Sequence, residues 1–164
     1  MALLVVDTSL LFVLTAIQRL DLLAAHVPLL VTNRGFDEHE QHASTRAHDY
    51  LKAERDAKRV TVQAGGHDSK ARELMRKHFG LSFTDAQALA LAMARNGFLL
   101  ADDTRLIQAA EAEGCDWVDL AALLIALRDE RKLDAKGMQD LVARIELEAM
   151  HTVKAATKRE LGLR

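Results

Sequence analysis

Short apolar runs that lead into acidic residues constrain this chain more than any other feature. Residues 3–6 precede Asp7, and residues 98–100 come shortly before Asp102 and Asp103. Each run has the length and composition of a strand buried on both faces, and a segment with a helical pattern follows it. Because the carboxyl ends of parallel strands share one edge of a sheet, we expect these acids to lie together at a ligand-binding edge.

The alternation of apolar runs and helical patterns continues along the chain. Further strands are expected at residues 28–31, 59–62 and 115–118. Helices are expected from Thr8 or Ser9 onwards and at residues 19–26, 33–58, 68–78, 85–95, 103–113, 120–131 and 135–150. The long segment 33–58 carries many charges and is interpreted as solvated helix. Strands alternating with helices predict an α/β fold with three α/β/α layers, Rossmann-like, around a central and mostly parallel sheet.

Length and composition limit the number of domains and the cellular compartment. A chain of 164 residues, 49% of them hydrophobic, is long enough for one domain, which we place at residues 1–150, before a basic helical tail at 151–164. The single cysteine, Cys115, cannot form an internal disulfide, which fits a reducing cytoplasm. We find no signal-peptide pattern and no apolar stretch that spans a bilayer, so we expect a cytoplasmic protein without a membrane partner. The net charge of −2 gives no overall nucleic-acid signature, although a local basic patch is enough for such binding.

Acidic residues occur where predicted strands meet helices, namely at Asp7, Asp37-Glu38, Asp85 and Asp102-Asp103. Two unit charges ~4 Å apart repel each other by roughly 4 kcal/mol at an effective dielectric constant near 20. Several converging carboxylates therefore need a cation to remain ionised, and Mg²⁺ or Mn²⁺ prefers such oxygen ligands. Structural alternatives remain open: Asp7 can cap a helix, Asp85 can complement a helix dipole, and one member of the late pair can be a cap.

Three segments resemble, in order, the motifs of PIN-domain nucleases. Residues 3–10, which contain Val-Val-Asp-Thr-Ser, resemble the first motif of that family. Residues 81–92 resemble the third motif, and residues 98–106 resemble the fourth. The resemblance extends from Leu3 to about Leu127, and the three motifs in order are more specific than any one of them.

The resemblance implies a Rossmann-like fold and cleavage of RNA that depends on a divalent metal, often by the toxin of a toxin–antitoxin pair. It matches Asp7 to the first acidic position, Asp85 to the third and Asp103 to the fourth. Asp102 is then a spare carboxylate, or the ligand in place of Asp103. In the fourth motif Ala101 stands where the family has a hydroxyl residue, so that a hydrogen bond to the metal shell is lost.

The second acidic position is matched by Glu38, with Glu40 as the alternative. Val31-Thr32-Asn33 replaces the usual valine-threonine-proline, and Arg34-Gly35-Phe36 departs from the family pattern. The resemblance therefore implies a catalytic set of Asp7, Glu38, Asp85 and Asp103. These residues, with Asp102 as a further ligand, would hold one or two Mg²⁺ or Mn²⁺ ions.

The partners follow in part from the same resemblance. It implies an RNA substrate, an antitoxin protein and a homodimer, and apolar residues on the early helical segments support a dimer face: Leu10, Leu11, Leu14, Leu22 and Leu23. A basic helix face is expected to contact phosphates if it borders the acidic cleft, and it comprises Lys70, Arg72, Arg76 and Lys77.

Other functions fit the sequence less well. His39-Glu40-Gln41-His42 spaces its histidines at i and i+3 rather than the i and i+4 of a zinc protease, so we interpret it as a solvated face. A flavodoxin-like phospho-acceptor would need a second early acid beside Asp7. The main rival is a PIN-like module with a degenerate site that binds RNA or a protein without cutting.

Overall fold

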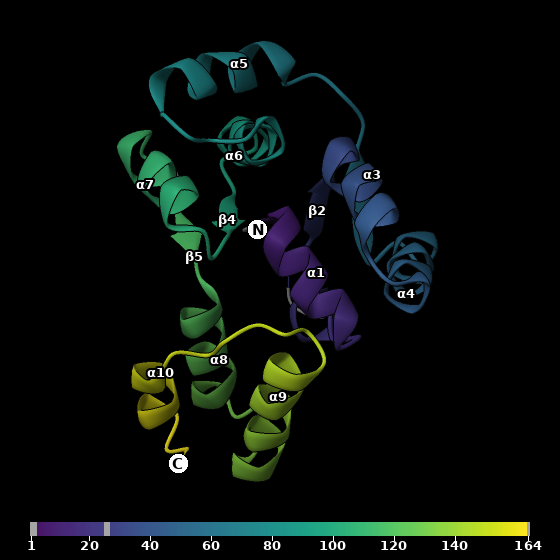
Figure 1. Cartoon of the computed structure of the whole chain (residues 1–164), viewed down its shortest axis with the longest axis vertical. Helices are drawn as coiled ribbons and strands as arrows, with labels where there is room; N and C mark the ends of the chain where they lie inside the picture. Colours follow the sequence, from purple (N-terminus) through teal and green to yellow (C-terminus); the bar gives the residue numbers. More distant parts are fainter. Residues whose placement is uncertain (1–2, 25–26, 164) are drawn as a thin grey trace.

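Figure 1 shows the protein as a computed structural model, which describes residues 3–24 and 27–163. The described residues form a five-stranded sheet of β1 (Leu4–Val6), β2 (Leu29–Thr32), β3 (Val60–Gln63), β4 (Phe98–Leu100) and β5 (Trp117–Val118). The helices are α1 (Thr8–Ala16), α2 (Asp21–Ala24), α3 (Asn33–His42), α4 (Thr45–Asp56), α5 (Asp68–Lys77), α6 (Phe83–Ala94), α7 (Thr104–Ala112), α8 (Leu120–Asp129), α9 (Ala135–Leu147) and α10 (Ala155–Glu160). The predicted helix end at His26 and the last residue of the predicted tail, Arg164, lie outside the described residues.

All neighbouring strands are parallel, in the order β3-β2-β1-β4-β5. The central strand is β1, whose Val5 lies opposite Leu30 of β2 and Leu99 of β4. The chain adds β2 and β3 on one side of β1 and then returns to add β4 and β5 on the other. The gap between the ends of β1 and β4 is therefore the topological switch point, where open α/β sheets bind ligands.

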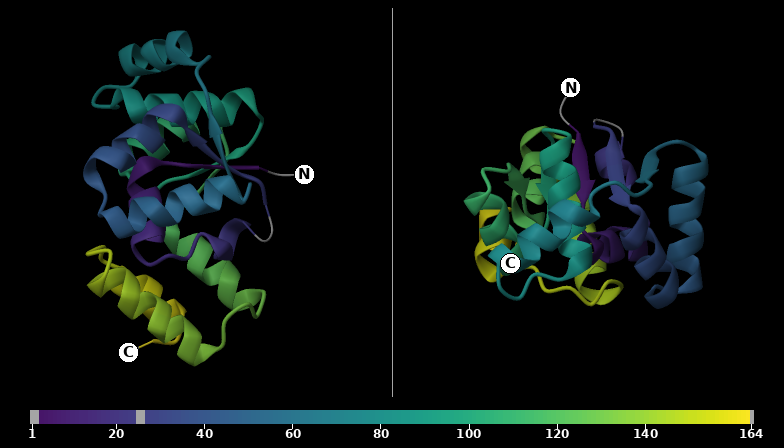
Figure 2. Two further views of the ribbon diagram at one scale, coloured as in Figure 1. Left: turned by 90° about the vertical axis from the view of Figure 1, so that its right-hand side faces the viewer. Right: turned by 90° about the horizontal axis from the view of Figure 1, so that it is seen from above.

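Alternate residues of the strands enter two different cores, which gives the predicted three layers. Val5 and Leu30 pack with residues of α5, α6 and α7 on one face of the sheet. Leu4 and Leu29 pack with residues of α1, α4, α8 and α9 on the other. Figure 2 shows the sheet edge-on between these two groups of helices. Because successive strand residues point to opposite faces, runs that are apolar throughout are what a doubly covered sheet requires.

Four of the five leucines that suggested a dimer face lie inside the protein, and Leu22 is partly buried. Leu10, Leu11, Leu14 and Leu23 are buried, and they belong to the core on the α1 side of the sheet. Their apolar character is explained by the fold of a single chain. The homodimer stays a prediction, which now rests on the family resemblance.

The segment 33–58 differs from its prediction as solvated helix. It forms two helices, α3 and α4, and Ser44 begins the second by accepting a hydrogen bond from the backbone N–H of Ala47 at 3.2 Å. His39 and His48 are buried, as is Glu54, which Arg59 engages through two hydrogen bonds. These helices pack on α1, so one side of each is removed from water although the segment is rich in charge.

The C-terminal segment returns to the core after α9. Val153 and Leu161 are buried in the core on the α1 side, and α10 lies between them in sequence. The division of the chain at residue 150 stays a prediction. Among residues 3–24 and 27–163, none of the helices combines the length and the apolar character needed to cross a membrane.

Candidate active site

Asp7 is the most buried of the predicted site residues. It follows β1 and caps α1, where the backbone N–H of Leu10 donates to its Oδ1 at 2.9 Å. The residue is 0% exposed, and its Oδ2 has no hydrogen-bond partner among the described residues. The two interpretations of Asp7 are therefore compatible, because one oxygen caps the helix and the other is left for a ligand.

The pKa of Asp7 is raised to about 7. Burial is the largest cause, because it disfavours the charged form, and the hydrogen bond from Leu10 opposes it. The negative charges of three other acids raise the pKa further, and they are Asp85, Asp102 and Asp103. Residues far apart in sequence thus act on one carboxyl group, as the strand-end pattern predicted.

Asp85 lies in the first turn of α6 and is held by the residue that caps this helix. Ser82 Oγ accepts a hydrogen bond from the backbone N–H of Asp85 at 3.1 Å and donates one to its Oδ2 at 2.7 Å. Burial raises the pKa of Asp85, the hydrogen bond from Ser82 lowers it, and the charges of Asp103 and Glu38 raise it. Ser82 therefore both caps α6 and orients the carboxylate of Asp85.

Asp102 and Asp103 follow β4 and engage different partners. Asp103 caps α7, with the N–H of Leu106 donating to its Oδ1 at 3.0 Å. Asp102 accepts a hydrogen bond from the N–H of Leu120 at 3.3 Å and pairs with His151, whose Nε2 lies 2.8 Å from Oδ2. Asp103 is therefore the member of the pair that caps the following helix, and Asp102 is held by other contacts.

Glu38 reaches the site because α3 packs closely on α1. Thr32 caps α3, and a Cβ added at Gly35 would lie 3.1 Å from the hydroxyl of Thr32 and 3.3 Å from that of Thr8. Gly35, which departs from the family pattern, therefore lies where the beginnings of α1 and α3 come close together. Glu38 acts electrostatically on Asp85, whereas Glu40 lies 3.6 Å from Nε2 of His48.

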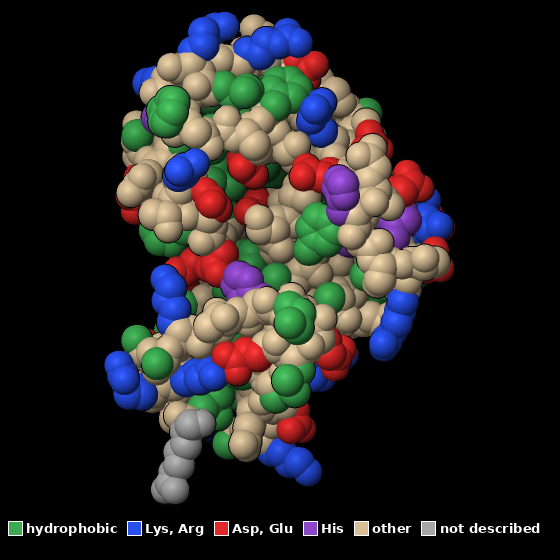
Figure 3. All heavy atoms as spheres, viewed as in Figure 1, with side chains coloured by type: hydrophobic (Ala, Val, Ile, Leu, Met, Phe, Trp, Pro, Cys, Tyr) green, Lys and Arg blue, Asp and Glu red, His purple; other side chains and the backbone are tan. Residues whose placement is uncertain are grey.

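These five acids, Asp7, Glu38, Asp85, Asp102 and Asp103, are called the acidic group below. Figure 3 shows Asp and Glu side chains gathered around a hollow at the centre of the face, between α7 and α3. Lys and Arg side chains gather instead over α5 at the top of this view. On that helix Lys70 pairs with Glu73 and Lys77 pairs with Glu113, so part of the predicted basic face is already neutralised.

The chemistry of the acidic group fits a divalent cation. Carboxylate oxygens are the donors that Mg²⁺ and Mn²⁺ prefer, and the buried Oδ2 of Asp7 lacks any compensating partner. The side chains are not yet assembled, however. Within the described part of the chain, no three Asp, Glu, His or Cys side chains stand together as a metal-binding set. A cation would draw these carboxylates together.

The histidines near Glu40 lie in different environments. His39 Nε2 lies 2.7 Å from Thr15 Oγ1, and His39 Nδ1 lies 3.1 Å from Nδ1 of His48. His42 is exposed, so His39 and His42 do not share one environment. The prediction of a solvated histidine face was wrong for His39 and His48, since both are part of the interior.

His151 was not singled out from the sequence as a site residue. It approaches Asp102 from the loop between α9 and α10, 49 positions away in the chain. No local pattern signals this contact, because it depends on where the C-terminal segment returns. Asp119 is another residue that was not predicted. It follows β5 and caps α8, and only its position at a strand end could have indicated it.

Comparisons with known proteins bear on both fold and site. A family model described as a PIN domain matches residues 3–161. Among solved structures, PAE2754 from Pyrobaculum aerophilum is similar with a TM-score of 0.54 and 18% identity, over 78% of this chain and 90% of that one. SSO1118 from Sulfolobus solfataricus P2, a PilT N-terminus domain protein, has a TM-score of 0.49 and 18% identity, over 93% and 99% of the two chains. No curated protein matches the chain.

Proposed function

Because this chain belongs to the PIN-domain family, which generally has a nuclease fold, we propose that it is a metal-dependent endoribonuclease. Its reaction would be hydrolysis of phosphodiester bonds in RNA. One observation carries the proposal: the buried Asp7 has an unpartnered oxygen and is coupled to the charges of three other acids. Perturbed carboxyl groups that converge at a switch point are typical of catalytic sites.

The proposed ligands of Mg²⁺ or Mn²⁺ are Asp7, Glu38, Asp85 and Asp103, with Asp102 as a further carboxylate. A bound ion supplies an activated water and positive charge to stabilise the phosphoryl oxygens. The chain itself orients the ligands, because Leu10 holds one oxygen of Asp7 and Ser82 holds one oxygen of Asp85. Without a cation these acids repel the RNA backbone, so we expect a bound cation to strengthen RNA binding.

Manganese binding tests this proposal directly. Mn²⁺ about 100-fold above its Kd stabilises a folded protein by about 2.7 kcal/mol. For a chain of this size that is roughly 5–10 °C in Tm. We expect Asp7→Asn to abolish this shift and to lower cleavage of single-stranded RNA at least ~100-fold. The same variant should raise the Tm without metal at pH 8, since asparagine still caps α1 but buries no charge.

The matched control is Asp134→Asn. Asp134 caps α9 through a hydrogen bond from Gly137, as Asp7 caps α1, but it is not a member of the acidic group. We expect this variant to retain both the Mn²⁺ shift and cleavage. An unchanged wild-type Tm in millimolar Mn²⁺ would count against a metal centre.

A binding module with a degenerate site is the second candidate. It is favoured by the absence, within the described residues, of an assembled metal-binding set, and by Ala101 in place of a hydroxyl residue. This candidate predicts RNA binding with neither a Mn²⁺ shift nor cleavage. Titration with Mn²⁺ therefore distinguishes the nuclease from the binding module.

The biological setting follows from the family resemblance. We propose a cytoplasmic homodimer that acts as the toxin of a toxin–antitoxin pair, with an antitoxin protein as its partner. A neighbouring reading frame for a small DNA-binding protein would support the toxin. Light scattering at micromolar concentration that gives the mass of one chain would contradict the homodimer.

A further inference from the structure

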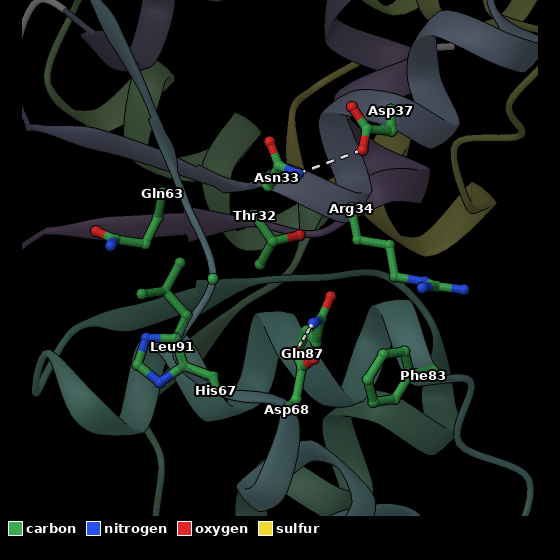
Figure 4. A pocket seen from close by; sticks show the side chains of 11 residues that line it. Thr32, Asn33, Arg34, Asp37, Gln63, His67, Asp68, Phe83, Gln87 and Leu91 are labelled. Atoms are coloured by element: carbon green, nitrogen blue, oxygen red, sulfur yellow. Dashed lines mark hydrogen bonds between the residues drawn. The ribbon is translucent and has the colours of Figure 1, made fainter.

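A small cavity lies beside the acidic group, between the ends of β2 and β3 and the helices α3, α5 and α6 (Figure 4). Its volume is about 230 Å³. Cavities for drug-sized ligands are typically about 300–1,000 Å³, so this one suits a single ring system. Its walls include an aromatic ring, an arginine and an amide, contributed by Phe83, Arg34 and Gln87.

The cavity adjoins the acidic group. Arg34 and Asp37 line both this cavity and a neighbouring hollow, which also contains Glu38 and Thr84. Glu38 is a proposed metal ligand, and Thr84 directly precedes Asp85. A nucleotide chain at the acidic group can therefore extend past Arg34 and place one residue in the cavity.

Flat surfaces for stacking are present at its entrance. The guanidinium carbon of Arg34 lies 4.9 Å from the centre of the Phe83 ring, and that of Arg72 lies 5.8 Å from it. Unpaired RNA bases are commonly bound by stacking on aromatic rings and on arginine planes. Figure 4 shows Phe83 and Arg34 side by side at one end of the cavity.

A hydrogen-bond acceptor without a donor lies in the wall. Gln87 Nε2 donates to Oδ1 of Asp68 at 2.6 Å, and a carboxylate only accepts, so the orientation of the amide is fixed. The other amide atom, Oε1, is shut off from water and has no partner among the described residues. Figure 4 shows this oxygen pointing away from Asp68, towards Thr32 and Arg34. Unsatisfied buried acceptors are rare and call for an explanation.

The charges of the cavity disfavour a phosphate group. Asp37 and Asp68 line it together with Arg34, so an anion would meet two negative charges. A neutral planar ring with N–H groups at its edge matches the stacking surface and the Gln87 acceptor. We propose that the cavity binds one nucleobase of the substrate, with Phe83 and Arg34 stacking on it and Gln87 Oε1 accepting from its exocyclic amino group.

The choice of RNA as ligand rests on the proposed nuclease function, whereas the base-binding role rests on the cavity. An exocyclic amino group is present in adenine, cytosine and guanine but not in uracil. Uracil offers only its ring N3–H to an acceptor, so a site that places Gln87 Oε1 at the exocyclic position favours amino-bearing bases over uracil. Phe83, Arg34 and Gln87 become specificity-determining residues that do not touch the cleaved bond.

Binding of labelled oligoadenylate and oligouridylate decamers, in EDTA to prevent cleavage, tests the cavity. We expect Phe83→Leu to weaken oligoadenylate binding by ~5- to 100-fold, the range for loss of one stacked base. Phe83→Tyr should restore binding, because it restores the ring. Phe79→Leu is the control, since Phe79 is 100% exposed and lies outside the cavity.

Gln87→Met tests the hydrogen bond separately from stacking. It keeps the length of the side chain and removes the acceptor, so we expect the preference for oligoadenylate over oligouridylate to disappear. Melting curves establish that each variant is folded before its affinity is measured. Equal affinity of wild type and Phe83→Leu for oligoadenylate, or no wild-type preference between the two decamers, would overturn the proposal.

The outcome for the cavity is distinguishable from that for the nuclease. If Mn²⁺ binding and cleavage depend on Asp7 while RNA affinity ignores Phe83, the nuclease stands and the base site is wrong. If RNA affinity depends on Phe83 in a protein that neither binds Mn²⁺ nor cleaves, the base site stands and the nuclease is wrong. Binding of ribose 5-phosphate in the cavity as tight as that of AMP also overturns the proposal, because that ligand has no base.

Discussion

Two regions of this protein bury ionisable side chains, and they do so in opposite ways. Asp7 and His39 are each 0% exposed. One oxygen of Asp7 has no partner, and the surrounding charges are of the same sign. Both ring nitrogens of His39 have partners inside the protein. Asp7 and His39 therefore differ in how their polar atoms are partnered rather than in the extent of their burial.

In the histidine region one tautomer satisfies both ring nitrogens of His39, whereas the buried Nε2 of His48 has no hydrogen-bond partner among the described residues. The hydroxyl of Thr15 donates to the carbonyl of Leu11 at 2.7 Å, so its oxygen accepts from His39 Nε2. His39 Nδ1 then accepts from Nδ1 of His48. This chain of hydrogen bonds joins α1, α3 and α4 and leaves His39 neutral. We interpret it as structural, whereas we propose that the acidic group binds a cation.

The late aspartates give the largest expected effect within the acidic group. Asp103→Asn should lower RNA turnover at least ~100-fold, because charge at the reacting phosphate is lost. Its stability should change little, since asparagine caps α7 as well as aspartate does. Asp102→Asn should lower turnover less than ~tenfold, because Asp102 is engaged by Leu120 and His151. Single-turnover cleavage and melting curves of both variants check this.

The reverse result has a definite meaning. An inactive Asp102→Asn with an active Asp103→Asn would show that the family register is displaced by one residue. Normal cleavage by both variants would remove this pair from the catalytic centre. Either result would weaken the contrast between a catalytic acidic group and a structural histidine region.

The histidine region should govern stability in acid rather than cleavage. The pKa of His39 is lowered to about 4, chiefly by burial and also by the charge of the neighbouring His48. Between pH 6.5 and about 4 the unfolded chain binds a proton that the folded chain does not. Stability therefore falls as pH falls through this window, by up to about 3 kcal/mol for this group.

Urea melts at pH 7 and pH 5 measure this effect. His39→Gln should lose part of the acid dependence, and His42→Gln should keep it, because His42 is exposed on the same helix. Neither substitution changes the polar groups around position 39. These groups are Thr15, His48 and, beyond His48, Glu40. Equal acid dependence of wild type and His39→Gln would exclude His39 as its source.

The two regions also differ in how far the sequence predicts them. Strand ends are signalled locally, because an apolar run and the acid after it are adjacent in the chain. The positions of Asp7 and Asp103 at the switch point could therefore be predicted. The alternation of strands and helices likewise predicted the three layers and the parallel sheet.

Contacts between distant helices could not be predicted in this way. His39 is buried by Thr15, 24 positions earlier, and the charges around it suggested a solvated segment. The contact of His151 with Asp102 depends on the path of the C-terminal segment. Charge density along a helix does not reveal which side packs, when only a few of its residues face inward.

Glu38 and Glu40 connect the two regions and provide the smallest expected effect. Residues two apart on a helix do not face each other, and these two meet different neighbours. Glu38 acts on Asp85, while Glu40 lies 3.6 Å from His48.

Glu38→Gln should lower turnover about tenfold, as expected when one of several ligands is weakened, and should reduce the Mn²⁺-induced rise in Tm. Glu40→Gln should leave turnover unchanged and alter stability by less than about 1 kcal/mol, as for an exposed ion pair. Loss of cleavage in Glu40→Gln alone would assign the second acidic position to Glu40, and α3 would then have to turn its histidine side towards the acidic group.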